Sequence, residues 1–239
     1  MLRSVIALVF VVFITGVVSL LAVTLALVDF SGNLIGRIAR VWGWSIFKLS
    51  GISIEIAGLD KLERGKSYVF VSNHASLLDI PAVVYSLPFQ LRFLVKKELY
   101  KIPVFGLGLR TAGHIRIDRG NLESAVESLK KASVRLKKQK ASVLVFAEGT
   151  RSLDGGIGRF KKGGIILALS MGIPIVPISI SGSRELAPKG DLMIKRGTIR
   201  LAVGNPISTE GKEISARNEL LEETRNEVIK NMAYESAAE

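Results

Sequence analysis

The sequence contains no cysteine and only two histidines, and aromatic residues make up 7% of it. Without cysteine, disulfides, thiolate metal sites and cysteine nucleophiles are all excluded. Two histidines without cysteine also make a poor ligand set for a structural zinc ion. We therefore expect neither a metal nor a cofactor.

Acidic residues are scarce relative to basic ones. There are 21 aspartates and glutamates against 33 lysines and arginines, which gives a formal net charge of +12. A basic surface of this size attracts nucleic acid, anionic lipid or a small anionic substrate. A membrane-tethered binder of nucleic acid or anionic lipid remains an alternative to an enzyme, but no recognised nucleic-acid motif accompanies the few aromatic residues.

Charge is absent altogether from residues 4–28, a run of 25 positions dominated by Val, Leu, Ile, Ala and Phe. At about 1.5 Å per residue, such a helix would cross a hydrocarbon core of roughly 30 Å. A cleaved signal peptide is the competing interpretation, but its apolar region is usually about 7 to 15 residues and ends in a small-residue cleavage site. The sequence favours a retained membrane helix.

A second, amphipathic helix is predicted over residues 34–50, which contain both tryptophans. Its basic residues Arg37, Arg40 and Lys48 lie away from an apolar face, a pattern that suits the lipid headgroup region or packing on the domain. Residues 1–50 are thus predicted to form a membrane-embedded segment, either spanning the membrane or forming a hairpin in one leaflet. The basic residues favour a cell membrane location with the remaining domain on the cytoplasmic side.

Residues 51–239 are predicted to form one α/β domain. Seven runs rich in Val, Ile and Phe alternate with helical patterns, and several are apolar on both faces, as strands covered by helices are. These predicted strands are SIEIAG, SYVFVS, RFLV, HIRI, ASVLVFA, IPIVPISI and TIRLAVG. Helices are predicted over residues 121–140, 164–171 and about 212–233. The order predicts a mixed β-sheet flanked by helices.

The stretch VSNHASLLDI places His74 just after an apolar strand and five residues before Asp79. In an unbroken helix, residues five apart lie about 140° from each other, so the two side chains would not meet. If they cooperate, His74 must lie in the turn at the carboxyl end of the strand, where open α/β sheets place their ligands. Ser76 and Asp79 also fit a helix capping box, and the spacing alone favours that structural alternative.

A second polar cluster, GHIRIDRG at residues 113–120, places Arg116, Asp118 and Arg119 at the end of a strand. By itself it fits a solvated strand edge with local ion pairs. A binding role for this cluster needs support from other motifs.

The third cluster, VLVFAEGTRSLDG at residues 143–155, runs from an apolar strand into Glu148, Gly149, Thr150 and Arg151. The glycine permits a tight turn, and the guanidinium can hold an oxyanion through two hydrogen bonds. Further cations follow in GRFKKGG, at residues 158–164. This junction is a candidate phosphate site.

Together and in this order, the clusters resemble the motifs of the glycerolipid acyltransferase family, specifically its bacterial 1-acyl-sn-glycerol-3-phosphate acyltransferases. NHASLLD at 73–79 is similar to the first motif, NHxSxxD, and GHIRIDR at 113–119 to the second. FAEGTRS at 146–152 resembles the third, FPEGTRS, with Ala147 where proline is usual, and IVPI at 175–178 matches the fourth. The resemblance covers roughly residues 66–205.

The resemblance implies that His74 is a general base with Asp79 as its partner. It also implies a set of residues that hold the acceptor phosphate: Arg116, Arg119, Glu148, Gly149, Thr150 and Arg151. Further candidates for contacts with the phosphate or the donor are Lys97, Arg159 and Lys161.

The activity implied is transfer of an acyl chain from acyl-CoA or acyl carrier protein to the sn-2 hydroxyl of 1-acylglycerol 3-phosphate (lysophosphatidic acid). The product is phosphatidic acid, and the expected partners are membrane lipid, this acceptor and the thioester donor. An acyltransferase that acts on glycerol 3-phosphate or another lysophospholipid is the nearest alternative. A hydrolase with Ser72 or Ser76 as nucleophile is a further one.

Overall fold

The computed structural model describes residues 2–25, 33–118, 120, 122–191 and 193–236. A seven-stranded sheet forms its centre, with strand order β1-β7-β6-β2-β5-β3-β4. The strands are β1 (Ile52–Ala57), β2 (Val69–Ser72), β3 (Leu91–Lys96), β4 (Ile115–Ile117), β5 (Ser142–Phe146), β6 (Ile175–Ser181) and β7 (Gly197–Val203). All neighbours are parallel except β6 and β7, which are antiparallel. The predicted mixed sheet is confirmed.

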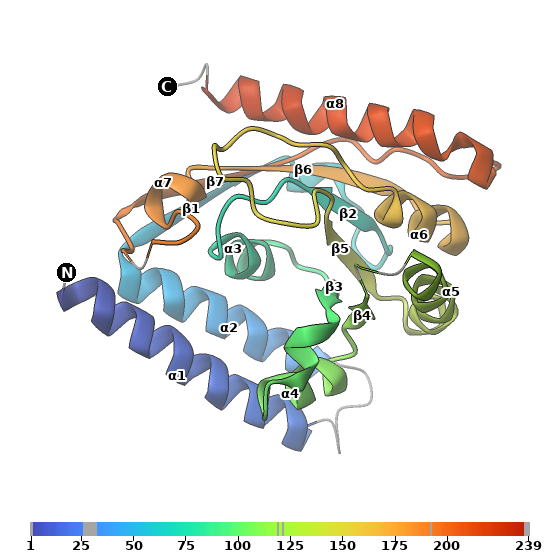
Figure 1. Ribbon diagram of the computed structural model, residues 1–239. Helices are drawn as coiled ribbons and strands as arrows, with labels where there is room; N and C mark the ends of the chain where they lie inside the picture. The colour runs from blue at the N-terminus through green and yellow to red at the C-terminus, as the bar shows by residue number, and fades with distance from the viewer. Residues whose placement is uncertain (1, 26–32, 119, 121, 192, 237–239) are drawn as a thin grey trace.

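Helices cover both faces of the sheet (Figure 1). The longer ones are α1 (Leu2–Leu25), α2 (Asn33–Ser50), α5 (Leu122–Gln139), α6 (Gly163–Met171) and α8 (Arg217–Ser236). Short ones are η1 (Leu59–Lys61), α3 (Asp79–Ser86), η2 (Lys97–Lys101), α4 (Phe105–Thr111), α7 (Ser183–Leu186) and η3 (Ile214–Ala216). The helix predicted over 212–233 is shifted, because η3 occupies the start of that range. Residues 26–28 and 121, at the ends of two predicted helices, lie outside the described residues.

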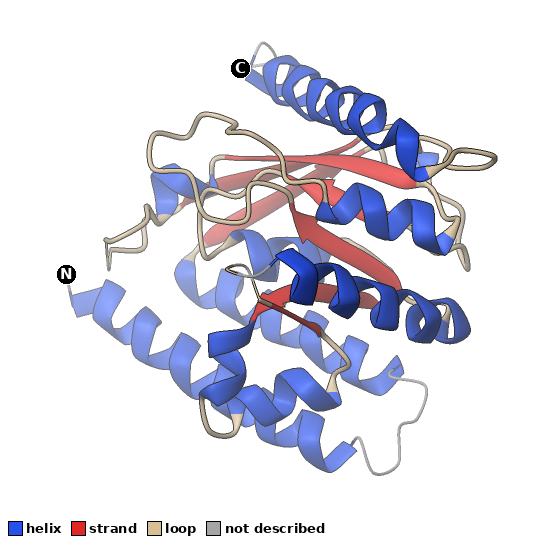
Figure 2. Ribbon diagram, turned by 45° about the vertical axis from the view of Figure 1, so that its right-hand side comes forward, coloured by secondary structure: helices blue, strands red, loops and turns tan. Residues whose placement is uncertain are grey.

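Two hydrophobic cores result from the alternation of side chains along the buried strands. Val69, Val71 and Val143 point to the face covered by α5, α6 and α8. Phe70 and Leu144 point to the opposite face, toward α2 and α3. Figure 2 shows the sheet between these helical layers. The apolar runs in the sequence are therefore explained by strands that are buried on both sides.

The N-terminal helices α1 and α2 pack side by side below the sheet (Figure 1). The indole Nε1 of Trp42 in α2 donates a hydrogen bond to Thr15 Oγ1 in α1, at 3.1 Å. Gly108 of α4 lets that helix approach α1 closely, because a Cβ at this position would lie 3.0 Å from Ser19 Cβ. The predicted boundary at residue 50 falls between α2 and β1, and packing between α2 and α3 crosses it.

Helix α1 is long and apolar enough to cross a membrane. Its window Ile6–Leu25 has a mean hydropathy of 2.9 and is 17% buried, whereas the core helix of a soluble protein would be mostly buried. Exposed side chains include Val9, Val12, Phe13 and Leu20. An apolar face of this kind is typical of contact with lipid. This helix is therefore a candidate membrane anchor.

Candidate active site

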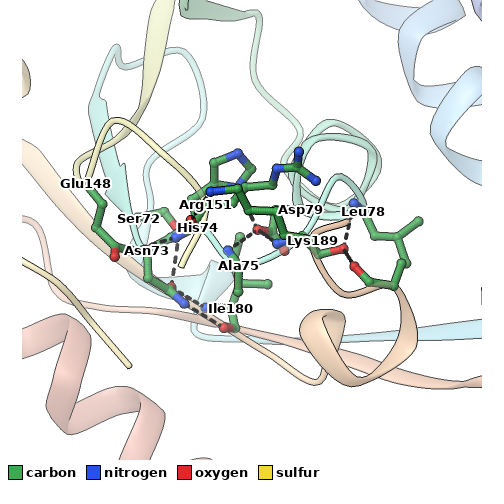
Figure 3. A network of polar contacts seen from close by, with 12 residues as sticks. Ser72, Asn73, His74, Ala75, Leu78, Asp79, Glu148, Arg151, Ile180 and Lys189 are labelled. Carbon is green, nitrogen blue, oxygen red and sulfur yellow. Dashed lines mark hydrogen bonds and ion pairs between the residues drawn. The ribbon is translucent and has the colours of Figure 1, made fainter. Parts of the chain in front are cut away.

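His74 and Asp79 meet in the turn between β2 and α3. Their Nδ1 and Oδ2 atoms are 2.7 Å apart, and the side chains are 13% and 0% exposed, respectively. Because a carboxylate only accepts hydrogen bonds, this contact places the proton on Nδ1 and leaves the lone pair on Nε2. Figure 3 shows the pair within its network of polar contacts. The arrangement is suitable for a general base.

The Asp79 carboxylate also organises the turn that carries His74. Besides the imidazole, Oδ2 accepts hydrogen bonds from the backbone N–H groups of Ala75 and Ser76, at 2.8 and 2.9 Å. The Ser76 hydroxyl accepts from the N–H of Leu78 at 3.2 Å. Only the carboxylate half of a capping box forms, because the Ser76 hydroxyl accepts from Leu78 and not from Asp79, and the N-cap of α3 is Leu78 without a side-chain hydrogen bond. The pairing alternative is met, since the same carboxylate oxygen contacts the imidazole of His74.

Aromatic stacking holds the imidazole from the other side. The rings of His74 and Phe146 are stacked, with centroids 4.0 Å apart and an interplanar angle of 16°. Phe146 is the last residue of β5, which pairs with β2 in the sheet. The ring orientation is therefore set by two neighbouring strands and by Asp79.

Glu148 joins the third motif to the first. Its Oε1 accepts the backbone N–H of His74 and its Oε2 accepts that of Gly158, both at 3.0 Å. The N–H of Ser152 donates to the carbonyl of His74 at 2.8 Å. Both backbone polar groups of His74 are thus bound by the third motif. Since Glu148 is buried and would repel a phosphate, the contacts fit a positioning role better than direct phosphate binding.

Asn73 connects the same turn to β6. Its Nδ2 donates to the carbonyl of Ile180, and its Oδ1 accepts the N–H of Ile180, each at 2.9 Å. Next to it, the hydroxyl of Ser72 donates to the carbonyl of Asn73, and that of Ser76 donates to the carbonyl of Ala187. Both serines are buried. These contacts favour structural roles for Ser72 and Ser76 over that of a nucleophile.

Gly149, Thr150 and Arg151 form the loop of the third motif, in which Thr150 is exposed and Gly149 and Arg151 are half-buried. Gly149 has a φ of +73°, which favours glycine, and a Cβ there would lie 3.0 Å from Lys161 Nζ. Lys189 Nζ lies 3.5 Å from Thr150 Oγ1 and 3.2 Å from the carbonyl oxygen of Arg151. The structure thus brings Lys161 and Lys189 to this loop. The sequence did not indicate Lys189 as a site residue, because Lys189 follows the fourth motif in an irregular segment.

The remaining predicted residues are Lys97, Arg116, Arg119 and Arg159. Lys97 forms an ion pair with Asp118, and this hydrogen bond holds the pKa of Asp118 below its ordinary value. Arg116 is exposed on β4, and Arg159 is exposed in the loop before α6. Arg119 lies outside the described residues. Lys97, Arg116 and Arg159 do not line the cavity beside His74.

A cavity of about 640 Å³ opens beside His74. Its polar lining includes His74, Thr150 and Arg151. Its apolar lining comes mainly from α1, α2, α3 and β3, and includes Leu8, Val11, Val18, Ile38, Trp42, Leu78 and Phe93. His74, the cations Arg92, Lys96 and Arg151, and the acid Asp191 therefore adjoin an apolar space that the N-terminal helices help to enclose.

The second histidine, His114, has a different environment. Burial, together with the positive charges of the neighbouring Arg92 and Arg135, lowers its pKa to about 3. Its Nδ1 accepts the backbone N–H of Phe93 at 3.2 Å. His114 is therefore neutral at physiological pH, and its Nδ1 is engaged with the backbone. His74 is the histidine whose partner suits proton transfer.

The family model described as Acyltransferase matches residues 53–181, which include the His–Asp pair and the third motif. The chain belongs to this acyltransferase family. It is similar to proteins named 1-acyl-sn-glycerol-3-phosphate acyltransferase: one from Limnanthes alba is 33% identical over 201 residues, covering 84% of this chain and 70% of that protein. A chloroplastic one from Brassica napus is 34% identical over 197 residues, covering 82% of this chain. The chain spans about half of that protein's length, 55%.

A solved structure shares the fold across nearly the whole chain. The crystal structure of the 1-acyl-sn-glycerophosphate (LPA) acyltransferase PlsC from Thermotoga maritima has a TM-score of 0.78 and 25% sequence identity. The match covers 96% of each chain. It therefore extends to the N-terminal helices as well as the sheet.

Proposed function

We propose that this chain transfers an acyl chain from a thioester to the sn-2 hydroxyl of 1-acylglycerol 3-phosphate, giving phosphatidic acid. The observation that carries the proposal is the 2.7 Å contact between His74 and Asp79 at a cavity lined by both Arg151 and apolar side chains. The pair supplies a base, the cation suits a phosphate, and the apolar wall suits acyl chains. The names of the relatives support the same acceptor.

In the proposed reaction, Nε2 of His74 removes the proton from the acceptor hydroxyl as its oxygen attacks the thioester carbonyl. The new C–O bond forms, the C–S bond breaks, and the thiolate leaves with the electron pair of that bond. Asp79 stabilises the imidazolium that forms on His74, as its carboxylate contacts Nδ1. Because a thiolate leaves readily, the imidazolium proton suffices to neutralise it. The reaction requires no metal or cofactor.

The donor is either acyl-CoA or acyl carrier protein. We propose that α1 and α2 hold the chain at the cell membrane, where the acceptor and product reside. In this arrangement, Arg37, Arg40 and Lys48 of α2 favour a cytoplasmic location of the catalytic domain. The acyl chain of the acceptor and the chain transferred from the thioester then both remain close to the lipid phase.

Arg151→Ala is expected to raise the acceptor KM for phosphatidic acid formation by roughly ten- to a hundredfold, because charge-assisted hydrogen bonds to the phosphate are lost. The donor KM should change little. Initial rates measured against 1-acylglycerol 3-phosphate concentration test this, with Arg64→Ala as the control. Arg64 is exposed before the amino end of β2, at the opposite end of that strand from His74. An acceptor KM equal to that of the control would remove Arg151 from the phosphate site.

A further inference from the structure

Helix α7 and the segment that follows it are attached to the loop at residues 150–153 by two basic side chains. Lys189 Nζ contacts the carbonyl of Arg151, and Arg184 donates to the carbonyl of Leu153 from Nε and Nη2, at 3.2 and 2.9 Å. The same segment is attached to the first motif, since Ser76 Oγ donates to the carbonyl of Ala187 at 2.8 Å. The loop that carries Lys189 is thus fixed relative to both His74 and Arg151.

Lys189 lies at the rim of the cavity. Its neighbours Ala187 and Pro188 line that cavity, as do Thr150 and Arg151, the two residues that its ammonium group contacts. The side chain is exposed, and Figure 3 shows it beside Arg151 and close to the His–Asp pair. Lys189 therefore adds a positive charge where Arg151 already provides one.

The ammonium group has donor capacity left for a ligand. Lysine carries three N–H donors, and two are directed at Thr150 Oγ1 and at the Arg151 carbonyl. The third is available to an anion at the rim. Two cations carried by adjoining loops, Arg151 and Lys189, match the charge of a phosphate monoester better than that of a phosphodiester, which carries a single negative charge.

We propose that Lys189 binds the acceptor phosphate together with Arg151 and selects acceptors with a terminal phosphate monoester. This inference rests on the proposed function. Lys189 contributes a direct charge contact, and its bond to the Arg151 carbonyl keeps the two cations at one site. Acceptors whose phosphate is esterified to a headgroup lose the second charge and gain bulk at the rim.

The test compares Lys189→Met, which removes the charge but keeps the length, with Lys189→Arg and the control Lys195→Met. Lys195 is exposed and its side chain does not line the cavity. Lys189→Met is expected to raise the KM for 1-acylglycerol 3-phosphate about five- to tenfold, with kcat and the donor KM within about twofold of wild type. Lys189→Arg should recover most of this loss.

Three results would overturn the proposal. They are an unchanged acceptor KM in Lys189→Met, a fall in kcat alone in that variant, or an acceptor KM in Lys189→Arg that is raised as much as in Lys189→Met. The last two would indicate that Lys189 only supports the loop. Circular dichroism confirms that each variant is folded before it is compared.

Measuring the Kd of 1-acylglycerol 3-phosphate in the absence of the donor tests the role of Lys189 independently of the proposed acyl transfer. The Kd should be weakened about five- to tenfold in Lys189→Met and unchanged in Lys195→Met. Failure of the wild type to form phosphatidic acid would overturn the proposed function. Equal Kd values for the two variants would overturn the role of Lys189, whatever the wild-type activity.

Discussion

Replacing His74 with alanine is expected to lower kcat for phosphatidic acid formation by roughly 10³-fold, within the 10²- to 10⁴-fold range typical of a general base. The acceptor hydroxyl would lose the Nε2 lone pair that removes its proton, while the cavity and the cations of the third motif would remain. Rates with saturating donor and acceptor measure this effect.

Folding should tolerate the His74→Ala change. The variant loses the stacking with Phe146 and one hydrogen bond, but Asp79 Oδ2 keeps the N–H groups of Ala75 and Ser76. We expect a loss of about 1–2 kcal/mol in the free energy of unfolding. Near-normal turnover in a folded His74→Ala protein would show that another group removes the proton.

Replacing Asp79 with alanine should reduce both activity and stability. Three N–H donors would lose their shared acceptor in a fully buried position. Since an unsatisfied buried donor costs about 1–3 kcal/mol, we expect a loss of roughly 3 kcal/mol or more in the free energy of unfolding. Turnover should fall by about 10³-fold, since the imidazolium loses its counter-charge. Denaturant titration and steady-state rates measure the two effects.

Asp79→Asn separates the charge from the geometry. All three donors contact Oδ2, whereas the buried Oδ1 has no hydrogen-bond partner among the described residues. An amide with its oxygen at the Oδ2 position therefore keeps the turn, and its NH₂ group replaces Oδ1. This variant should be more stable than Asp79→Ala but equally poor in turnover. Full activity in Asp79→Asn would mean that the carboxylate charge is not needed.

Hydrophobic patterning predicted the sheet well because its strands are buried on both faces. Runs such as SYVFVS and ASVLVFA are apolar on both faces and are therefore easy to recognise. The first contains β2 and the second contains β5. Helix α5 was equally clear from its apolar face. The turn at His74 that pairing with Asp79 requires is also present, because α3 begins only at Asp79.

Helix α4 could not be predicted from the sequence. Its residues, FGLGLRT, include two glycines, which disfavour a helix. Packing requires them, since a Cβ at Gly106 would lie 2.3 Å from the Tyr100 carbonyl oxygen, and Gly108 contacts α1. The tertiary contacts thus override the local preference. No local pattern contains this information.

The polar contacts of the site were predictable only in part. The His74–Asp79 pair lies within one turn, so geometry restricted where it could form. The bond that the Glu148 carboxylate accepts from the N–H of His74, and the bond that Lys189 donates to the third motif, join segments far apart in the sequence. Such contacts depend on the strand order, which hydrophobic patterns do not determine.

Product identification after incubation with a panel of acceptors tests the proposed reaction most directly. The wild-type protein would receive 1-acylglycerol 3-phosphate, glycerol 3-phosphate, or a lysophospholipid with a larger headgroup, each with acyl-CoA or acyl carrier protein thioester. Mass spectrometry should show phosphatidic acid formed from 1-acylglycerol 3-phosphate, and little product from the other acceptors. Acylation of another acceptor without phosphatidic acid, or release of free fatty acid alone, would contradict the proposal.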